Sequence, residues 1–214
     1  MTSTPDPAVA EEWDDRYVRA PQVWSGRPNG ALLTEVERLP PGRALDVGCG
    51  EGADAVWLAQ QGWDVTALDV SAVALDRAAA AAEAAGVRIT WVHAGLSAAD
   101  LPADFDLVSA QYPALLRTPD RDEERALLGA VAPGGTLLVV HHADVDPEQL
   151  RAHGLDPDAY VLHEDVVGLL GDGWRVETAE RRPRDVRSGA GAHHTHDLVL
   201  RVTRTSSSTD EIAP

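Results

Sequence analysis

Three alternating glycines follow a short apolar run in the first quarter of the chain. Residues 44–52 read A-L-D-V-G-C-G-E-G, and an alanine-rich helical pattern follows over 53–61. Alternating glycines let the backbone turn sharply and leave no Cβ between it and a ligand. The start of the next helix presents free N–H groups at the same place. This order of strand, glycine loop and helix predicts a nucleotide site around Gly48 and Gly50.

The charge around this loop bears on which nucleotide binds. Gly48, Gly50 and Ala53 also fit the dinucleotide fingerprint G-x-G-x-x-A. A pyrophosphate would however lie near the carboxylates of Asp46 and Glu51, with no basic residue beside them in the sequence. S-adenosylmethionine (SAM) instead brings an amino group and a sulfonium, which nearby carboxylates favour. The acidic loop therefore favours SAM.

Two motifs carry a family resemblance. D-V-G-C-G-E-G at 46–52 resembles the first motif of class I SAM-dependent methyltransferases, and A-L-D-V-S at 67–71 is similar to their second. The resemblance covers roughly 13–204 and extends to small bacterial methyltransferases of the tellurite-resistance type. It implies methyl transfer from SAM and an α/β, Rossmann-like fold. The implied sheet has seven strands and is mostly parallel, with the last strand antiparallel and inserted between the fifth and sixth.

The chain alternates strand-like and helical patterns, which is typical of a parallel sheet covered on both faces. The expected strands are 43–47, 64–69, 88–93, 105–110, 135–141, 174–180 and 195–203. The expected helices are 30–38, 53–61, 71–85, 121–131, 147–153 and 163–170. Ser71 is expected to cap the third helix and Gly86 to end it. Residues 133–135, P-G-G, are expected to form a tight turn.

One methyltransferase domain is predicted over 13–204, with residues 13–38 forming an N-terminal cover. The polar, acidic residues 1–12 and the Ser/Thr-rich tail 205–214 are expected to be disordered. The segment 144–162 is expected to be a lid, a substrate wall or a structural connector.

Ligands of open α/β sheets bind at the carboxyl ends of the strands. In the resembling family these ends hold the methionine portion, the ribose hydroxyls, the adenine and the transferred methyl group, in that order along the chain. The residues implied here are Asp46, Gly48, Cys49 and Gly50 for the methionine, Asp69 for the ribose, Val70, Gly95 and Leu96 for the adenine, and Gln111 beside the methyl group. From the N-terminal cover, Trp24 is expected to shield the cofactor, and Arg27 or Arg16 to pair with its carboxylate.

Five of the eight histidines fall into two clusters, 141–142 and 193–196. The implied strand order would bring the two clusters together at the rim of the site. His141, His142 and His194 are the candidates for a general base, because imidazole titrates near neutral pH. Binding of a metal together with Asp144 is an alternative, and a purely structural role is another. No metal is included in the favoured interpretation.

The net charge of −17 disfavours nucleic acid and anionic membranes as partners. No apolar run is long enough to cross a membrane, and the N-terminus lacks the apolar core of a signal peptide. A cytoplasmic protein with a small-molecule methyl acceptor is expected, and the oligomeric state does not follow from the sequence.

Two other functions stay open. One is an NAD(P)-binding oxidoreductase, because Asp69 would suit either ribose. The chain has no lysine, however, which excludes the Tyr-x-x-x-Lys pair of short-chain dehydrogenases. The other is a non-catalytic, SAM-binding regulatory protein.

Overall fold

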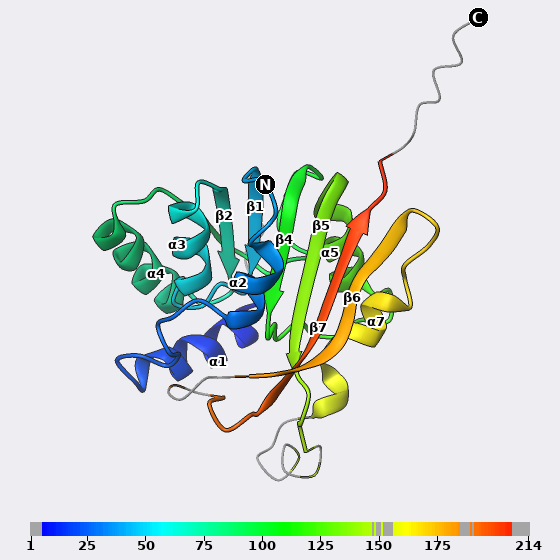
Figure 1. Ribbon diagram of the computed structural model, residues 1–214. Helices are drawn as coiled ribbons and strands as arrows, with labels where there is room; N and C mark the ends of the chain where they lie inside the picture. The colour runs from blue at the N-terminus through cyan, green and yellow to red at the C-terminus, as the bar shows by residue number, and fades with distance from the viewer. Residues whose placement is uncertain are drawn as a thin grey trace, which may run out of the picture.

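A seven-stranded sheet forms the centre of the molecule (Figure 1). The computed structural model describes residues 6–146, 148, 151, 156–184, 189 and 191–206. The strands are β1 (Arg43–Val47), β2 (Asp64–Asp69), β3 (Thr90–His93), β4 (Phe105–Gln111), β5 (Val131–His142), β6 (Trp174–Pro183) and β7 (His196–Arg204). Their order is β3-β2-β1-β4-β5-β7-β6, and β7 runs antiparallel to both of its neighbours. The predicted fold class and the insertion of the last strand are confirmed.

The strand order reverses between β1 and β4, which are parallel neighbours. From β1 the chain proceeds outward to β2 and β3, whereas β4 leads to β5 on the other side. Ligands of open α/β sheets bind at the carboxyl ends of the strands beside such a reversal. The glycine loop after β1 and the ends of β2 and β4 lie at this point.

Helices cover both faces of the sheet. They are α1 (Pro7–Val18), α2 (Gly30–Val36), α3 (Ala53–Gln60), α4 (Ala72–Ala85), α5 (Asp122–Ala130) and α7 (His163–Val167), with a 3-10 turn η1 (Pro157–Ala159). Side chains of α2 and α3 pack on one face, and those of α5 and α7 on the other. Successive strand residues point to opposite faces, so Leu45 joins the α5 side and Ala44 the α2 side.

The predicted ends of α4 are confirmed. The Ser71 hydroxyl accepts a hydrogen bond from the Ala74 N–H at 3.0 Å. Gly86 ends the helix in the left-handed conformation, with φ of 70°. These local signals lie within one turn of the helix end, which is why they can be identified from the sequence.

The N-terminal boundary differs from the expectation. Residues 7–12 were expected to be disordered, but they form the first turns of α1. Asp6 caps this helix by accepting from the Ala8 N–H at 2.9 Å, and Pro7 occupies the first turn. A capping residue followed by proline is a helix-start signal. The acidic composition of this segment concealed that signal.

β5 also starts earlier than expected. α5 ends at Ala130 and β5 begins at Val131, so residues 133–135 lie within a strand rather than in a separate turn. The pairing register with β4 shifts next to Phe105, which accommodates the glycines as an irregularity in the ladder.

Parts of two expected segments lie outside the described residues: most of the helix over 147–153 and most of the tail over 205–214. Residues 1–5 lie outside them as well. None of the helices in the described ranges is both long and apolar enough to cross a membrane.

Candidate active site

The glycine loop folds back onto the end of β2. The Cys49 N–H donates to the Leu68 carbonyl at 3.0 Å, and the Gly50 N–H donates to Asp69 Oδ2 at 2.8 Å. Asp69 is therefore tied to the loop after β1, and the two strand ends form a single unit.

Gly48 and Gly50 have different surroundings although both have positive φ, 67° and 53°. Within the described part of the chain, no atom lies within 4 Å of the place where a Cβ of Gly48 would stand. A Cβ on Gly50 would stand 2.9 Å from Tyr17 Oη and 3.0 Å from Trp24 Nε1. Gly48 thus leaves open space for a ligand, whereas the missing Cβ of Gly50 leaves room for Tyr17 and Trp24 of the N-terminal cover.

Three buried carboxylates surround this loop. Asp69 accepts from the Ser71 N–H at 2.9 Å, and Asp54 accepts from the backbone and side chain of Asn29, both at 2.7 Å. Asp46 Oδ2 is buried and has no hydrogen-bond partner among the described residues. Burial, and then the charges of Asp54 and Asp69, raise the pKa of Asp46 well above its usual value. A positively charged ligand group would compensate this unpaired carboxylate.

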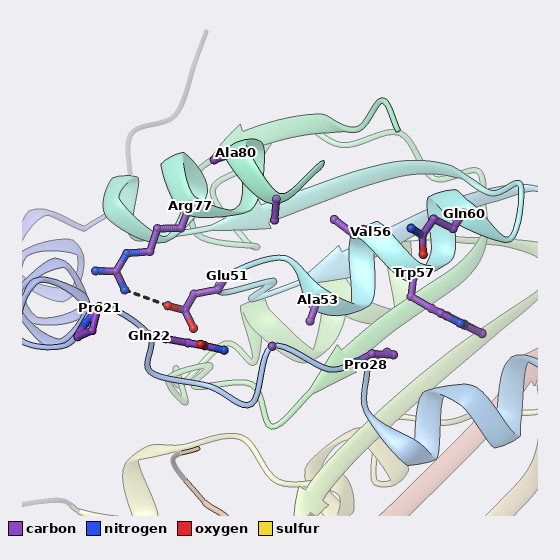
Figure 2. Close-up of a pocket in the computed structure, with 12 residues that line it drawn as sticks. Pro21, Gln22, Pro28, Glu51, Ala53, Val56, Trp57, Gln60, Arg77 and Ala80 are labelled. Atoms are coloured by element: carbon purple, nitrogen blue, oxygen red, sulfur yellow. Dashed lines mark hydrogen bonds and ion pairs between the residues drawn. The ribbon is translucent and has the colours of Figure 1, made fainter. Parts of the chain in front are cut away.

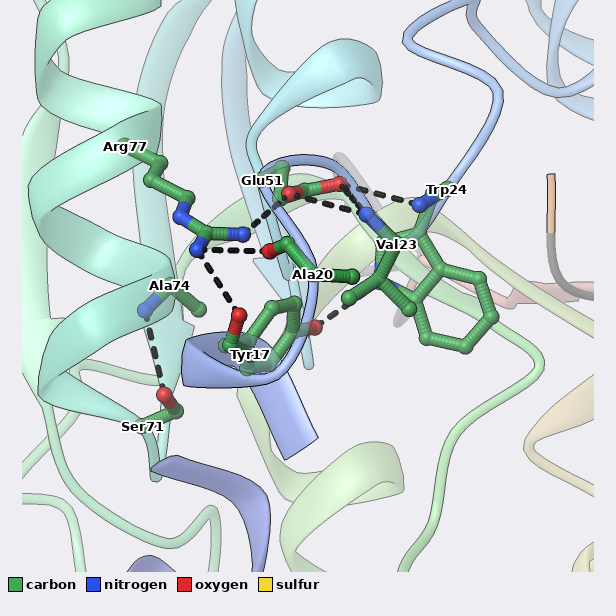
Figure 3. Close-up of polar contacts among 8 residues, drawn as sticks. All are labelled: Tyr17, Ala20, Val23, Trp24, Glu51, Ser71, Ala74 and Arg77. Atoms are coloured by element: carbon green, nitrogen blue, oxygen red, sulfur yellow. Dashed lines mark hydrogen bonds and ion pairs between the residues drawn. The ribbon is translucent and has the colours of Figure 1, made fainter. Parts of the chain in front are cut away.

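Glu51 does not join these carboxylates as the sequence suggested. Its side chain accepts from the N–H groups of Val23 and Trp24, at distances of 3.0–3.2 Å. It also pairs with Arg77 at 2.9 Å. Figure 3 shows these contacts converging on Glu51 from the cover and from α4. Glu51 therefore anchors the N-terminal cover, and Asp46 remains the carboxylate with a free oxygen.

The cover is held from several sides. Arg77 donates to the carbonyls of Tyr17 at 2.8 Å and Ala20 at 2.9 Å, and Figure 3 shows its guanidinium bridging them to Glu51. Asp14 of α1 accepts from the Ser71 hydroxyl at 2.5 Å, at the start of α4. The predicted cover thus lies over the glycine loop.

Arg77→Ala should loosen this cover. The substitution removes one ion pair and two hydrogen bonds to carbonyls, so we expect unfolding to require about 1–2 kcal/mol less, given partial solvent exposure. We also expect faster trypsin cleavage after Arg16 and Arg19, measured by limited proteolysis with mass spectrometry. Arg88→Ala, at an exposed position, is the control. Equal cleavage of the two variants would contradict the role given to Arg77.

The two arginines considered for the cofactor carboxylate differ in their surroundings. Arg27 is exposed, and its side chain makes no hydrogen bond or ion pair with any described residue; only its backbone contacts Ser25. The Arg16 guanidinium lies 5.0 Å from the Trp13 ring centre and 5.5 Å from that of Trp24. Arg16 is therefore placed beside the predicted shielding tryptophan, and the cofactor contact of Arg27 stays a prediction.

The residues expected around the adenine lie at two neighbouring strand ends. The Val70 carbonyl is 2.9 Å from His93 Nε2. A Cβ on Gly95 would meet no described atom within 4 Å, whereas the Leu96 side chain is buried in the core.

Burial, followed by the charge of Asp46, raises the pKa of the Cys49 thiol, which therefore stays protonated.

A cavity of about 470 Å³ lies beside this site, between the cover, α3 and α4 (Figure 2). Glu51 and Arg77 contribute to its wall, but Asp46, Gly48 and Asp69 do not. The candidate cofactor site is therefore the glycine loop with the buried carboxylates, and this cavity is a separate, neighbouring space. Most of its other lining residues are apolar or small: Pro21, Gly26, Pro28, Ala53, Val56, Trp57, Ala80 and Ala81.

Gln111 ends β4, and Tyr112 follows it directly. Gln111 Nε2 donates to the Ser109 hydroxyl at 3.1 Å, and its Oε1 is buried without a partner in the described part of the molecule. Tyr112 has φ of 52°, a rare conformation for an aromatic residue. The predicted role of Gln111 beside the methyl group is untested.

The predicted convergence of the two histidine clusters is confirmed. The rings of His142 and His194 stack at 3.9 Å between centres, and His193 lies 4.0 Å from His194. His196 instead lies 3.3 Å from Asp144. No group of three or more potential metal ligands occurs among the described residues, so the metal alternative gains no support.

His141 points to the other face of the sheet, as alternation requires. Its ring lies 6.5 Å from that of His163, and neither of its nitrogens has a hydrogen-bond partner within the described ranges. Burial, followed by the charge of His163, lowers its pKa to about 4.

His141 should make stability sensitive to acid. Its pKa in the fold is about 4 and near 6.5 in the unfolded chain. The stability contributed by the neutral ring is therefore complete above pH 6.5 and is lost as pH falls toward 4. Between pH 7.5 and pH 5 the wild type should lose about 2 kcal/mol more than His141→Leu, measured by urea unfolding. The exposed His193→Leu should follow the wild type, and identical pH profiles for all three proteins would contradict the assignment.

The sequence did not point to two residues of this region, Arg184 and Asp197, and it placed Tyr17 only in general terms, as an aromatic of the N-terminal cover. Tyr17 is buried on α1 and touches the glycine loop. Asp197 is buried in β7, where an acidic residue opening an apolar strand was an available signal. Arg184 follows β6 directly, and nothing local in the sequence distinguishes it from the other arginines.

Comparison with known proteins agrees with this geometry. Residues 44–135 match the methyltransferase domain family. An uncharacterised methyltransferase of Mycobacterium tuberculosis is 43% identical over 122 residues, which cover 56% of this chain and 60% of that protein. The tRNA 5-carboxymethoxyuridine methyltransferase of Escherichia coli is 32% identical over 130 residues, 59% of this chain and 45% of that protein. The matches to these relatives thus span less than two thirds of their length.

A solved structure supports the fold over nearly the full length. The protein from a study of the conversion of a disulfide bond into a thioacetal group in echinomycin biosynthesis superimposes with a TM-score of 0.72, 24% identity and 94% coverage of both chains. The match to the methyltransferase domain family thus covers residues 44–135, which include the glycine loop, and the similarity of the fold extends over nearly the whole chain.

Proposed function

We propose that this protein transfers the methyl group of SAM to a small-molecule nucleophile. The observation that carries the proposal is the buried, unpaired Oδ2 of Asp46 beside the open face of Gly48. A carboxylate at this position suits the amino group of SAM and disfavours the pyrophosphate of NAD(P).

The residues present fit SAM at each end. Asp69 carries one carboxylate whose two oxygens each accept a single backbone N–H, which leaves lone pairs for the ribose hydroxyls. Asp46 would hold the amino group, and Val70 with the backbone at Gly95 and Leu96 would border the adenine. Trp24 would cover the cofactor from the N-terminal side.

SAM supplies an already activated methyl group, so this chain's own contribution is positioning and exclusion of water. The ion pair between Glu51 and Arg77 holds the N-terminal cover over the glycine loop, and the cover in turn helps to exclude water from the site. Gln111, at the end of β4, and Tyr112 after it lie where the acceptor would approach, and the buried Gln111 Oε1 is available to orient the acceptor.

A small molecule fits the charge of the protein better than RNA. Neutralising phosphates requires clustered, unpaired cations, and the net charge is −17. Several arginines are already paired with carboxylates: Arg77, Arg117, Arg151, Arg175, Arg181, Arg182 and Arg201. The tRNA acceptor named for the Escherichia coli relative is therefore the alternative to test.

Calorimetric titration with SAM, S-adenosylhomocysteine (SAH) and NAD(P) tests the cofactor. Binding of NAD(P) without any response to SAM would overturn the proposal in favour of an oxidoreductase. Incubation with radiolabelled methyl-SAM and either a metabolite extract or total tRNA then tests the acceptor. Label in the metabolite fraction is the expected result. Label in tRNA would overturn the small-molecule assignment, and SAM binding without transfer to either fraction would favour a regulatory protein.

A further inference from the structure

The ring of His142 is fixed between two others. Tyr112 stacks on it at 4.3 Å between centres and 25° between planes, and His194 stacks at 3.9 Å and 16°. Two rings cannot occupy the same face, so these neighbours lie on opposite faces of the imidazole. Only the edge of the His142 ring, with its two nitrogens, remains available for polar contacts.

A carboxylate faces one of these nitrogens. Asp197 of β7 is the direct pairing partner of His142 in β5, so both side chains project from the same face of the sheet. Asp197 Oδ1 lies 3.7 Å from His142 Nδ1. Both atoms are buried, and neither makes a hydrogen bond to another described residue. Catalytic hydrogen bonds are often this loose before substrate binds and tighten afterwards.

The carboxylate determines which nitrogen is protonated. An ionised carboxylate only accepts hydrogen bonds, so it favours the tautomer with the proton on Nδ1. The lone pair of the neutral ring then lies on Nε2. A fifth of the His142 side chain is exposed although Nδ1 is buried. Nε2 faces Gly191, where a Cβ would stand 3.2 Å from it, so the glycine leaves room beside this nitrogen.

Asp197 is itself held in place. Its Oδ2 accepts from the Tyr112 hydroxyl at 2.8 Å, and Arg184 Nε lies 3.5 Å from its Oδ1. Arg184 Nε also donates to the Tyr112 hydroxyl at 3.2 Å. The side chains of Arg184 and Asp197 are each only 7% exposed, so the guanidinium compensates a carboxylate that water does not reach.

The backbone of Tyr112 is in the left-handed conformation, which is unfavourable for an aromatic residue. Its φ of 52° costs roughly 1–2 kcal/mol for a residue with a Cβ. Strained residues of this kind persist where the surrounding contacts hold them, and they concentrate at functional sites. Here the strain lies directly after Gln111, at the strand end predicted to border the methyl group.

The other two candidate histidines are less suited to accept a proton. His141 points to the opposite face, and both of its nitrogens are enclosed. Burial, followed by the neighbouring His142 and His193, lowers the pKa of His194 to about 4. His194 also forms no ion pair with a carboxylate among the described residues.

We infer that His142 is the base that removes the acceptor's proton and that Asp197 is its positioning residue, held by Tyr112 and Arg184. This inference rests on the proposed methyl transfer and narrows the acceptor to one that enters carrying a proton on oxygen or nitrogen. His142 Nε2 takes that proton, and the acceptor's electron pair forms the bond to the methyl carbon. The carbon–sulfur bond breaks onto sulfur, giving neutral SAH, and the imidazolium then releases its proton to water.

Nuclear magnetic resonance of the ring nitrogens tests the arrangement without knowledge of the acceptor. In the ¹⁵N-labelled wild type with SAH bound, His142 should carry its proton on Nδ1. In Asp197→Asn the carboxylate that favours a proton on Nδ1 is lost, so the tautomer of His142 should change. The dissociation constant for SAH, measured by calorimetry, should stay within about threefold. Asp144→Asn is the matched control, since Asp144 lies beside His196; it should leave the His142 signals unchanged.

The outcomes separate the two proposals. A proton on Nε2 in the wild type would overturn the inference, and this measurement needs no variant, so it decides the matter even if Asp197→Asn fails to fold. Unchanged His142 signals in a folded Asp197→Asn that binds SAH would also overturn it, leaving the proposed function intact. Absence of SAH and SAM binding in the wild type would overturn the proposed function and the role as base with it.

Discussion

Asp69→Ala should weaken SAM binding by about 2–4 kcal/mol, roughly 30- to 900-fold. Asp69 is expected to accept from both ribose hydroxyls, and each hydrogen bond to a charged group is worth about 1.5–3 kcal/mol, less partial replacement by water. Its carboxylate is buried at the end of β2 and already accepts from Gly50 and Ser71. Isothermal titration calorimetry with SAM and SAH gives the measurement.

The control for this prediction is at the other end of the same strand. Asp64 is exposed at the start of β2, so Asp64→Ala should leave SAM affinity unchanged. Because Asp69 also supports the glycine loop, each variant should be checked by thermal unfolding before titration. Unchanged SAM affinity in a folded Asp69→Ala would show that the end of β2 does not hold the ribose.

Gly52→Ala should destabilise the fold by about 2–5 kcal/mol. Gly52 precedes α3 with φ of 82°, and the left-handed conformation costs a residue with a Cβ roughly 1–2 kcal/mol. The added Cβ would also stand 2.7 Å from the Ala78 Cβ and 3.1 Å from its Cα. Overpacking of this kind costs about 1–3 kcal/mol more, because neither atom can rotate away.

Urea unfolding of a matched set tests the two contributions. Gly86→Ala has a similar φ of 70° but open space around the new Cβ, so it should show the conformational cost alone. Ala78→Gly in the Gly52→Ala background should recover part of the loss, apart from about 1 kcal/mol for glycine inside a helix. Equal destabilisation by Gly52→Ala and Gly86→Ala would refute the close approach of α3 and α4.

The order of the elements could be predicted because its signals are local. The glycine loop at 48–52, the capping Ser71 and the helix-ending Gly86 each act within a few residues of their own position. The family resemblance then supplied the strand order, including the insertion of β7. The predicted disorder of residues 1–12 was wrong for 7–12, which belong to α1, because the acidic composition was given more weight than the Asp6–Pro7 cap.

The cofactor site was predictable only in outline. Asp46 and Asp69 lie in the last residues of β1 and β2, and Gly48 follows β1 directly, so the edge of the sheet that they share is implied by the topology. The direction of a side chain is not: Glu51 lies in the same loop as Gly50, yet it turns toward Val23, Trp24 and Arg77.

The sequence by itself determined the fold class, the glycine loop and the meeting of two histidine clusters, because each follows from local pattern and from the strand order that the family resemblance implied. Alternation along a strand already implied that His141 and His142 point to opposite faces, but only the tertiary structure decided that His142 faces Asp197. Partners 55 residues apart, such as His142 and Asp197, are set by the β5–β7 register. A shift of one residue would turn every side chain of that strand to the other face. Register depends on the packing of both faces at once, and no local stretch of sequence contains it.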